Sequence, residues 1–307
     1  TAAVVLHGVT AGYGDRAAIE DVNLEIAAGS LTAIFGPNGG GKSTLLKCIA
    51  GLMQPWSGSI AVLGAPAGTF AQRVAYVPQA EQVDWSFPVS VDEVVMMGRT
   101  PMIGVGRSPQ KSDRDRVAAA LDRVEMGHLS KRQIGELSGG QRRRVFLARA
   151  IAADPEIYLL DEPTTGLDPQ ARHLMWERLQ QLLQQGKSIL LTTHFMDEAE
   201  RLCDRLLVID HGRKLAEGTP RELIAQHIEP EVVEVYGPGA QQLITAPIRS
   251  RADRAELVGD TVFFYTHHAA SLLLELARQP SLRTLHRPAN LEDLFLKLTG
   301  RQIREGA

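Results

Sequence analysis

The feature that most constrains the fold of this 307-residue chain is residues 31–50, where an apolar run leads into a glycine-rich loop and then an apolar helical pattern. The loop satisfies the spacing G-x-x-x-x-G-K-[ST] with Gly36, Gly41, Lys42 and Ser43. Glycines at 36, 39, 40 and 41 let backbone N–H groups turn toward a phosphate at the positive end of a helix. Lys42 can reach the β- and γ-phosphates, and the Ser43 hydroxyl can bind Mg²⁺. The strand at 31–35 and the helix after the loop favour an α/β phosphate-binding domain over a plain glycine turn.

Composition limits the class of protein. The chain has 44% hydrophobic and 22% charged residues, which is typical of a soluble globular protein with one large and one smaller domain. No apolar run approaches the roughly 18 residues of a membrane-spanning helix, and no secretory signal pattern is expected, so work on a membrane requires partner subunits. A net charge of −3 disfavours a nucleic-acid partner. Cys48 and Cys203 are expected to be reduced thiols of a cytoplasmic protein.

Two candidate site residues lie in the first third of the chain. Residues 4–10 and 22–26 predict antiparallel strands around a turn at 11–15, where Tyr13 stands between two glycines. An aromatic ring in that place can stack on a base, although an ordinary surface tyrosine is an equal alternative. Residues 73–77 predict a strand, and Gln79 just beyond it can offer its amide oxygen to a metal and to an attacking water.

Polar residues follow two further apolar strands, at 157–160 and 188–192. Asp161 and Glu162 end the first, so Asp161 can hold Mg²⁺ while Glu162 serves as general base toward a γ-phosphate. His194 follows the second strand and can donate a hydrogen bond to the γ-phosphate. Asp168 is expected to cap a helix that Pro169 opens.

A second anion-binding site is predicted at the motif LSGGQ, residues 137–141, which precedes an apolar-periodic helix. The Ser138 hydroxyl and the N–H groups of Gly139 and Gly140 would lie at the N-terminus of that helix. Because the motif cannot serve the first phosphate loop within one chain, the economical arrangement is a head-to-tail dimer in which each LSGGQ closes over the nucleotide of the partner.

The remaining segments predict a helical insert at about 81–150 and a small α+β domain at the C-terminal end. Capping boxes are expected at Ser90 with Glu93 and at Ser112 with Asp115. Trp85, Phe87, Met96 and Met97 form either a partner-docking surface or part of the core. In the tail, strands are expected at 232–236, 261–265 and 282–286, and helices at 269–277 and 290–299, the last capped by Asn290.

In this order, GPNGGGKST, Gln79, LSGGQ, LLDEP, Asp168 and His194 resemble the nucleotide-binding subunit of ATP-binding-cassette (ABC) transporters over residues 1–220. The resemblance implies Mg²⁺-dependent hydrolysis of ATP by a P-loop nucleotide-binding domain with an antiparallel β subdomain and a helical insert. It also implies a homodimer beneath membrane permease subunits, at the cytoplasmic face of the membrane, with an extracytoplasmic binding protein in uptake systems. Residues 221–307 would be a regulatory or dimerisation domain.

The resemblance also implies roles for single residues, in two groups. Within one chain, Tyr13 would stack on adenine, and the metal would be held by Ser43, Gln79 and Asp161. The residues that would carry catalysis are Glu162, His194, Gln79 and Lys42. The residues that would hold the phosphates are Gly36, Asn38, Gly39, Gly40, Gly41, Lys42, Ser43 and Thr44. Across the dimer, the ATP is completed by Ser138, Gly139, Gly140 and Gln141, and Asp168 links the two sites.

The finer resemblance changes along the chain. Residues 1 to about 155, with VPQAEQVDWSFPVSVDEVVMMGR, resemble ATPases of manganese, zinc and iron uptake. Residues from about 163 to 307, with TTHFMDEAERLCDRL and NLEDLFLKLTGRQIRE, resemble ATPases of nodulation-factor and drug exporters. A natural mosaic or an engineered chimera would produce such a change.

The region expected to contact the permease therefore decides which class of transported molecule the sequence favours. Because the permease is expected to dock near Gln79 and the helical insert, residues 79–130 should select the partner. These residues favour divalent metal uptake over export of lipo-oligosaccharides or drugs. The remote alternative is a soluble ABC ATPase acting on ribosomes or DNA.

Overall fold

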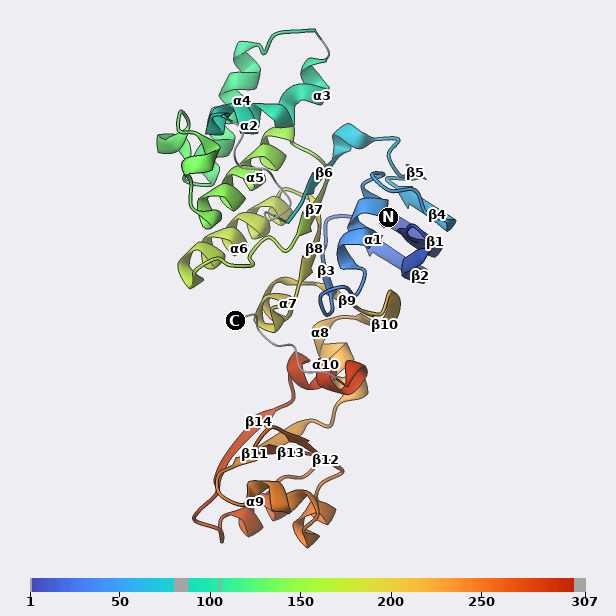
Figure 1. Cartoon of the computed structure of the whole chain (residues 1–307), viewed down its shortest axis with the longest axis vertical. Coiled ribbons are helices and arrows are strands. Elements are labelled where there is room, and N and C mark those ends of the chain that lie inside the picture. The colour runs from blue at the N-terminus through green and yellow to red at the C-terminus, as the bar shows by residue number, and fades with distance from the viewer. Residues whose placement is uncertain (1, 80–87, 105, 301–307) are drawn as a thin grey trace. The chain divides into compact units, whose positions relative to one another are not determined.

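The computed structural model describes residues 2–79, 88–104 and 106–300. The chain divides into two compact units, Thr1–Glu217 and Gly218–Ala307. The α/β fold expected for the first unit is confirmed, with its sheets and helices labelled in Figure 1.

The central element of the first unit is a six-stranded sheet in the order β10-β9-β3-β8-β7-β6. Its strands are β3 (Leu31–Phe35), β6 (Val74–Val77), β7 (Ile157–Asp161), β8 (Ser188–Thr193), β9 (Arg205–Asp210) and β10 (Arg213–Gly218). β3, β7 and β8 are buried along their whole length, as expected of apolar strands in a sheet covered on both faces. β3 runs parallel to β8 and β9, and β7 runs parallel to β6 and β8. The carboxyl ends of these strands therefore meet at one edge.

A four-stranded sheet in the order β2-β1-β4-β5 forms the antiparallel β subdomain. Its strands are β1 (Ala2–Tyr13), β2 (Arg16–Ala27), β4 (Ser57–Val62) and β5 (Ala65–Pro66). The turn expected at residues 11–15 is shorter than predicted, because 11–13 continue β1, with Gly12 paired to Ala17 and Tyr13 paired to Arg16. A Cβ at Gly12 would lie 1.9 Å from the Arg16 carbonyl oxygen, so glycine allows this close approach.

Helices complete the first unit: α1 (Lys42–Ile49), α2 (Val91–Met96), α3 (Thr100–Ile103), α4 (Lys111–Arg123), α5 (Gly139–Ala153), α6 (Pro169–Gln184) and α7 (Met196–Leu202). In the helical insert, α2 and α4 pack on α5. The capping box of Ser90 with Glu93 is confirmed. The expected box of Ser112 with Asp115 is wrong, because α4 begins earlier and Gln110 caps it with Asp113. Trp85 and Phe87 lie outside the described residues.

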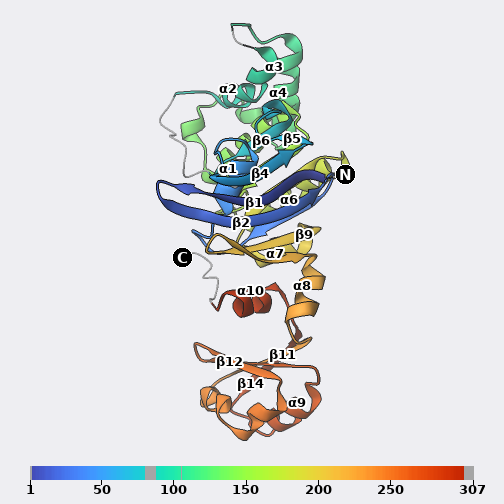
Figure 2. The same cartoon turned by 90° about the vertical axis from the view of Figure 1, so that its right-hand side faces the viewer.

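The second unit contains a four-stranded sheet in the order β12-β13-β11-β14. Its elements are α8 (Pro220–His227), β11 (Glu231–Tyr236), β12 (Arg254–Val258), β13 (Thr261–Thr266), α9 (Ala270–Leu276), β14 (Arg283–Pro288) and α10 (Leu291–Thr299). The expected α+β tail is confirmed, with Asn290 capping α10, whereas β12 was not predicted. α9 packs on one face of the sheet, where Leu272 and Leu276 join a core with Val233 and Phe264 (Figure 2).

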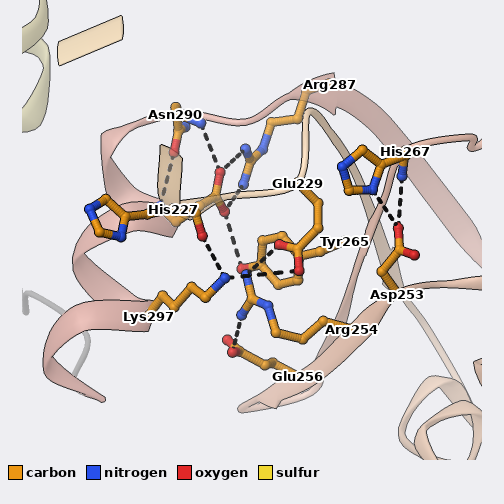
Figure 3. Close-up of polar contacts among 11 residues, drawn as sticks. His227, Glu229, Asp253, Arg254, Glu256, Tyr265, His267, Arg287, Asn290 and Lys297 are labelled. Atoms are coloured by element: carbon orange, nitrogen blue, oxygen red, sulfur yellow. Dashed lines mark hydrogen bonds and ion pairs between the residues drawn. The ribbon is translucent and has the colours of Figure 1, made fainter. Parts of the chain in front are cut away.

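A network of ion pairs ties α10 to the sheet of the second unit (Figure 3). The carboxylate of Asp293, 2% exposed, accepts hydrogen bonds from Arg287 at 2.7 and 3.0 Å and from the Tyr265 hydroxyl at 3.2 Å. Arg254 lies over the Tyr265 ring at 3.6 Å and pairs with Glu229 at 3.2 Å. These contacts join charged groups of α10, β12 and β14 with the Tyr265 ring of β13.

Neither cysteine is in a disulfide, and both are buried. Burial raises the pKa of the Cys48 thiol to about 11, and burial also raises the pKa of Cys203. In residues 2–79, 88–104 and 106–300, no helix is long and apolar enough to span a bilayer.

Candidate functional site

The glycine-rich loop between β3 and α1 is built so that only glycine fits at two positions. A Cβ at Gly36 would lie 2.0 Å from the Ile209 carbonyl oxygen, and one at Gly41 would lie 2.4 Å from the Ala18 carbonyl oxygen. Gly41 also has a φ of 100°, in the region that L side chains rarely adopt. The backbone therefore packs closely against two neighbouring segments and leaves the N-terminus of α1 open to an anion.

The remaining loop residues surround that N-terminus. Asn38 and Gly39 are exposed, Gly40 and Thr44 are buried, and Ser43 is half-buried. Lys42 is the first residue of α1, and its Nζ donates hydrogen bonds to the carbonyl oxygens of Gly36 at 2.9 Å and Pro37 at 3.1 Å. Burial lowers the pKa of Lys42, while the carboxylates of Glu162 and Asp161 oppose that shift. The ammonium group thus lies inside the loop, beside two acidic side chains.

Asp161 is the last residue of β7 and Glu162 follows it, and a threonine of the neighbouring strand contacts both. The Thr192 hydroxyl donates to Asp161 Oδ1 at 2.7 Å, and Thr192 Oγ1 itself accepts a hydrogen bond from the Glu162 N–H at 2.8 Å. The Tyr76 hydroxyl donates to Asp161 Oδ2 at 3.3 Å. Sequence reasoning missed Tyr76 and Thr192, whose only signal is their position near the ends of β6 and β8.

The Glu162 carboxylate has contacts with side chains from several segments of the site. It accepts hydrogen bonds from Gln79 Nε2 at 3.1 Å and from the Thr165 hydroxyl at 3.2 Å. Lys42 Nζ and His194 Nδ1 each lie 3.7 Å from its Oε1. The structure therefore brings together all four residues that the sequence predicts to be catalytic. Thr165 is an additional contact that sequence reasoning missed.

Two properties of Glu162 follow from its surroundings. Burial raises the pKa of its carboxyl, but the neighbouring His194, Lys42 and Thr165 outweigh burial, and the pKa lies below the usual value of 4.5. Its backbone has a φ of 49°, an uncommon conformation for a residue with a side chain, which costs about 1–3 kcal/mol. The hydrogen bond to Thr192 helps to hold that conformation.

The donor set at this edge fits Mg²⁺, which prefers oxygen ligands. The Asp161 carboxylate is buried at 2% exposure, and Gln79 directs its amide nitrogen to Glu162, so the amide oxygen is its other end. The Ser43 hydroxyl on α1 would supply a third oxygen. Mg²⁺ bound there would neutralise phosphate charge.

The residues expected to act across a dimer lie at two other helix N-termini. Ser138 caps α5 and forms a capping box with Gln141, so Gly139 and Gly140 are the first two helical residues, whose N–H groups have no intrahelical partner. Asp168 caps α6 by accepting the Ala171 N–H at 2.9 Å, as predicted. Ser138, Gly139 and Asp168 are exposed.

Tyr13 is the last residue of β1 and lies beside α1. Its side chain is 54% exposed, and Lys47 Nζ lies 5.8 Å from the ring centroid. A tyrosine ring that is both exposed and next to the phosphate-binding helix is placed to stack on a base.

The fold, with the glycine-rich loop at the carboxyl edge of its parallel strands, defines the chain as a P-loop nucleotide-binding protein. Residues 19–165 match the family described as "ABC transporter", and residues 240–300 match "Nodulation factor export protein NodI, C-terminal domain". Similar proteins include "Nod factor export ATP-binding protein I" of Rhizobium sp. (strain N33), 43% identical, with 99% of each chain aligned. The protein of the same name from Cupriavidus metallidurans is 46% identical, over 99% of this chain and 100% of its own.

Solved structures agree. An ATP-binding subunit of an ABC transporter matches 74% of this chain and 93% of its own, with 28% identity and a TM-score of 0.64. A dimeric ATP-binding cassette bound to ADP and Pi matches 70% of this chain and 98% of its own, with 27% identity and a TM-score of 0.63. The chain belongs to the ATP-binding subunits of ABC transporters and is an ATP hydrolase.

The comparisons do not support two of the finer expectations. Relatives of one name align with both halves of the chain, so there is no sign of a mosaic with a join between residues 155 and 163. The same relatives are named for Nod factor export, which fits the exporter alternative better than the expected divalent metal uptake.

Proposed function

We propose that the chain is the ATP-hydrolysing subunit of an ABC exporter that moves a lipo-oligosaccharide of the Nod factor type. The observation that carries the proposal is that both units match proteins of a single name. The alignment with a Nod factor export protein covers 99% of the chain, and residues 240–300 match the C-terminal domain of that class.

The chemistry proposed for the site follows from its contacts. The loop N–H groups and Lys42 hold the phosphates, and Tyr13 holds the base. Glu162 accepts the proton of the attacking water, because its carboxyl is ionised at neutral pH. The His194 imidazole, whose Nδ1 lies 3.7 Å from Glu162 Oε1, is proposed to donate a hydrogen bond to the γ-phosphate. Ser43, Gln79 and Asp161 are the proposed Mg²⁺ ligands.

Dimerisation completes this site in the proposal. The N-terminus of α5, with Ser138 and Gly140, would close over the ATP of the partner chain, and Asp168 would contact both sites. A structural relative solved as a dimer with ADP and Pi supports this arrangement. The second unit is proposed to assist dimerisation or regulation.

A groove of about 180 Å³ offers a place for the permease. Its lining includes Met97, Gly98, Pro101 and Met102 of the helical insert with Tyr76 of β6. Met97 and Met102 are exposed, and methionine surfaces adapt readily to a partner. In the proposal, this groove binds a permease segment at the cytoplasmic face of the membrane and couples that segment to Gln79.

The test of the partner is affinity purification of the tagged chain from its native membranes, with mass spectrometry of what is retained. Recovery of an exporter permease without a binding protein supports the proposal. A metal-uptake permease with a substrate receptor would overturn it, and so would capture of ribosomes or DNA in place of a permease. Met97→Glu should abolish permease capture, whereas Leu52→Glu, at an exposed apolar position outside the groove lining, should retain it.

The test of the chemistry is Glu162→Gln. This variant keeps the shape of the side chain but removes the base, so turnover should fall to near zero while ATP binding and ATP-induced dimerisation persist. Wild-type hydrolysis in Glu162→Gln would remove Glu162 from the base role.

A further inference from the structure

A second buried carboxyl group lies behind the site, in helix α7. The side chain of Glu198 is fully buried, at 0% exposure. Its Oε2 accepts a hydrogen bond from the Thr164 hydroxyl at 3.1 Å, and its Oε1 accepts one from Trp176 Nε1 at 3.0 Å. The Thr193 hydroxyl contributes a further hydrogen bond to the carboxyl. Glu198 therefore gathers donors from three separate segments of the first unit.

Two of these donors belong to the segments that carry the catalytic residues. Thr164 lies two residues after Glu162, and Thr193 is the last residue of β8, directly before His194. The third donor, Trp176, lies in the middle of α6, away from the segments that carry Glu162 and His194. One carboxyl group thus connects the backbone segment after Glu162 to the segment before His194.

The two segments need such a connection. Glu162 has a φ of 49°, and its N–H is bound to Thr192, so Glu162 is held from the N-terminal side. Beyond Glu162 the chain leaves the sheet, and the Thr164 contact with Glu198 is the next buried side-chain attachment. On the other segment, Thr193 Oγ1 also accepts the Phe195 N–H at 3.0 Å, which fixes the turn around His194.

A buried glutamate is costly to keep unless it serves a purpose, because an apolar side chain of similar size would pack there without desolvation cost. The alternative explanation is that Glu198 only stabilises the packing of α7 on α6. In that alternative, the hydrogen bond from Trp176 to Glu198 is the contact that matters, and it matters for stability. The two explanations therefore differ in which of the donors matters for turnover.

We infer that Glu198 is a positioning residue for ATP hydrolysis: through Thr164 and Thr193 it holds the carboxylate of Glu162 and the imidazole of His194 at their mutual distance of 3.7 Å. It touches neither nucleotide nor metal. The inference rests on the catalytic roles proposed for Glu162 and His194. It does not depend on the direction of transport.

The experiment compares three variants of the full chain in steady-state ATP hydrolysis, with the melting temperature of each. Glu198→Gln keeps the side-chain shape but replaces one acceptor by a donor, and Thr164→Val removes the hydroxyl on the Glu162 side. Trp176→Phe is the matched control, because it removes a hydrogen bond to the same carboxyl from a segment without catalytic residues. Displacements of about 1 Å at a reacting group can lower turnover about 100-fold.

We expect Glu198→Gln and Thr164→Val to lower kcat by about 10- to 100-fold with the KM for ATP unchanged. Trp176→Phe should lower the melting temperature and leave kcat near that of the wild type. In a His194→Ala background, Glu198→Gln should cost much less in kcat, because one of the two positioned groups is already absent.

The inference is overturned if folded Glu198→Gln retains wild-type kcat, or if Trp176→Phe lowers kcat as much as Thr164→Val does. Should Glu198→Gln fail to fold, Thr164→Val against Trp176→Phe decides by the same criterion. Glu162→Gln is measured in the same assay, so failure of the proposed base, seen as retained turnover in that variant, is distinct from failure of the positioning role.

Discussion

The ion-pair network of the second unit gives a prediction whose size follows from the structure. One oxygen of Asp293 accepts hydrogen bonds from Arg287 at 2.7 Å and from the Asn290 N–H at 2.9 Å. In Asp293→Asn an NH₂ group takes the place of that oxygen, so the Arg287 and Asn290 N–H groups lose their acceptor and face another hydrogen-bond donor. Removing one charge of a buried pair costs about 3–5 kcal/mol. Glu234 still pairs with Arg287, and Arg287 is 18% exposed, so we expect the lower end, about 3 kcal/mol.

Hydrogen–deuterium exchange of the full chain measures this loss within the second unit. A loss of about 3 kcal/mol accelerates exchange of the amides of β11 and β13 by about two orders of magnitude. Intrinsic fluorescence is a second readout, because all three tryptophans lie in the first unit at 56, 85 and 176. Their unfolding transition should therefore not move.

Asp253→Asn is the control for this prediction. Asp253 pairs with His267 at 2.9 Å, but the two side chains are 51% and 62% exposed (Figure 3). Exposed pairs are screened by water and contribute little, so the exchange rates should stay near those of the wild type. The reasoning is refuted if Asp293→Asn exchanges like the wild type, or if Asp253→Asn is equally damaging.

Three further predictions concern the first unit. Tyr13→Ala should weaken ATP binding by about 5- to 150-fold, since stacking on a base contributes about 1–3 kcal/mol, and a titration with fluorescent ATP analogue in which affinity is unchanged would contradict the stacking role. Gly41→Ala should abolish nucleotide binding, because its Cβ would lie 2.4 Å from a carbonyl oxygen, whereas Gly186→Ala, at a similar φ of 77° but with no atom within 4 Å, should still bind in the same titration. Burial raises the pKa of Glu198 above the usual 4.5, although its hydrogen bonds and the charge of Arg172 act in the opposite direction. The contribution of Glu198 to the stability of the folded chain is therefore full below pH 4.5 and is lost as the pH rises through the raised pKa. The melting-temperature advantage of the wild type over Glu198→Gln should therefore shrink as the pH is raised above 4.5, and a difference that stays constant with pH would refute the shift.

Local rules in the sequence were enough for much of the site. The loop at 36–43 is recognisable in the sequence because its glycines are required by the conformation of the backbone there. Asp161 and Glu162 are recognisable because they follow an apolar run that is typical of a buried strand. The caps at Ser138, Asp168 and Asn290 involve residues within a few positions of each other, so their pattern is visible in the sequence.

The features that were missed depend on contacts between distant segments. Thr192 contacts residues 31 positions away in the chain, and Glu198 contacts Thr164 at a separation of 34. The start of α4 was misplaced because Asp113, rather than Asp115, forms the capping box. Asp113 also pairs with Arg99 at 3.0 Å, and a local sequence pattern does not reveal that contact. The expected metal uptake rested on a resemblance confined to the front half, whereas the relatives that align with the whole chain are named for Nod factor export.

The burial of both thiols makes this chain a convenient starting point for site-specific labelling. Cys48 and Cys203 are shielded from reagents, and burial keeps both in the unreactive thiol form. A cysteine introduced at an exposed position such as Gln185, outside the proposed site, would therefore be the preferred target of a maleimide probe. Spin or fluorescent labels placed this way can follow the approach of two chains during each ATP cycle without first rebuilding the interior of the protein.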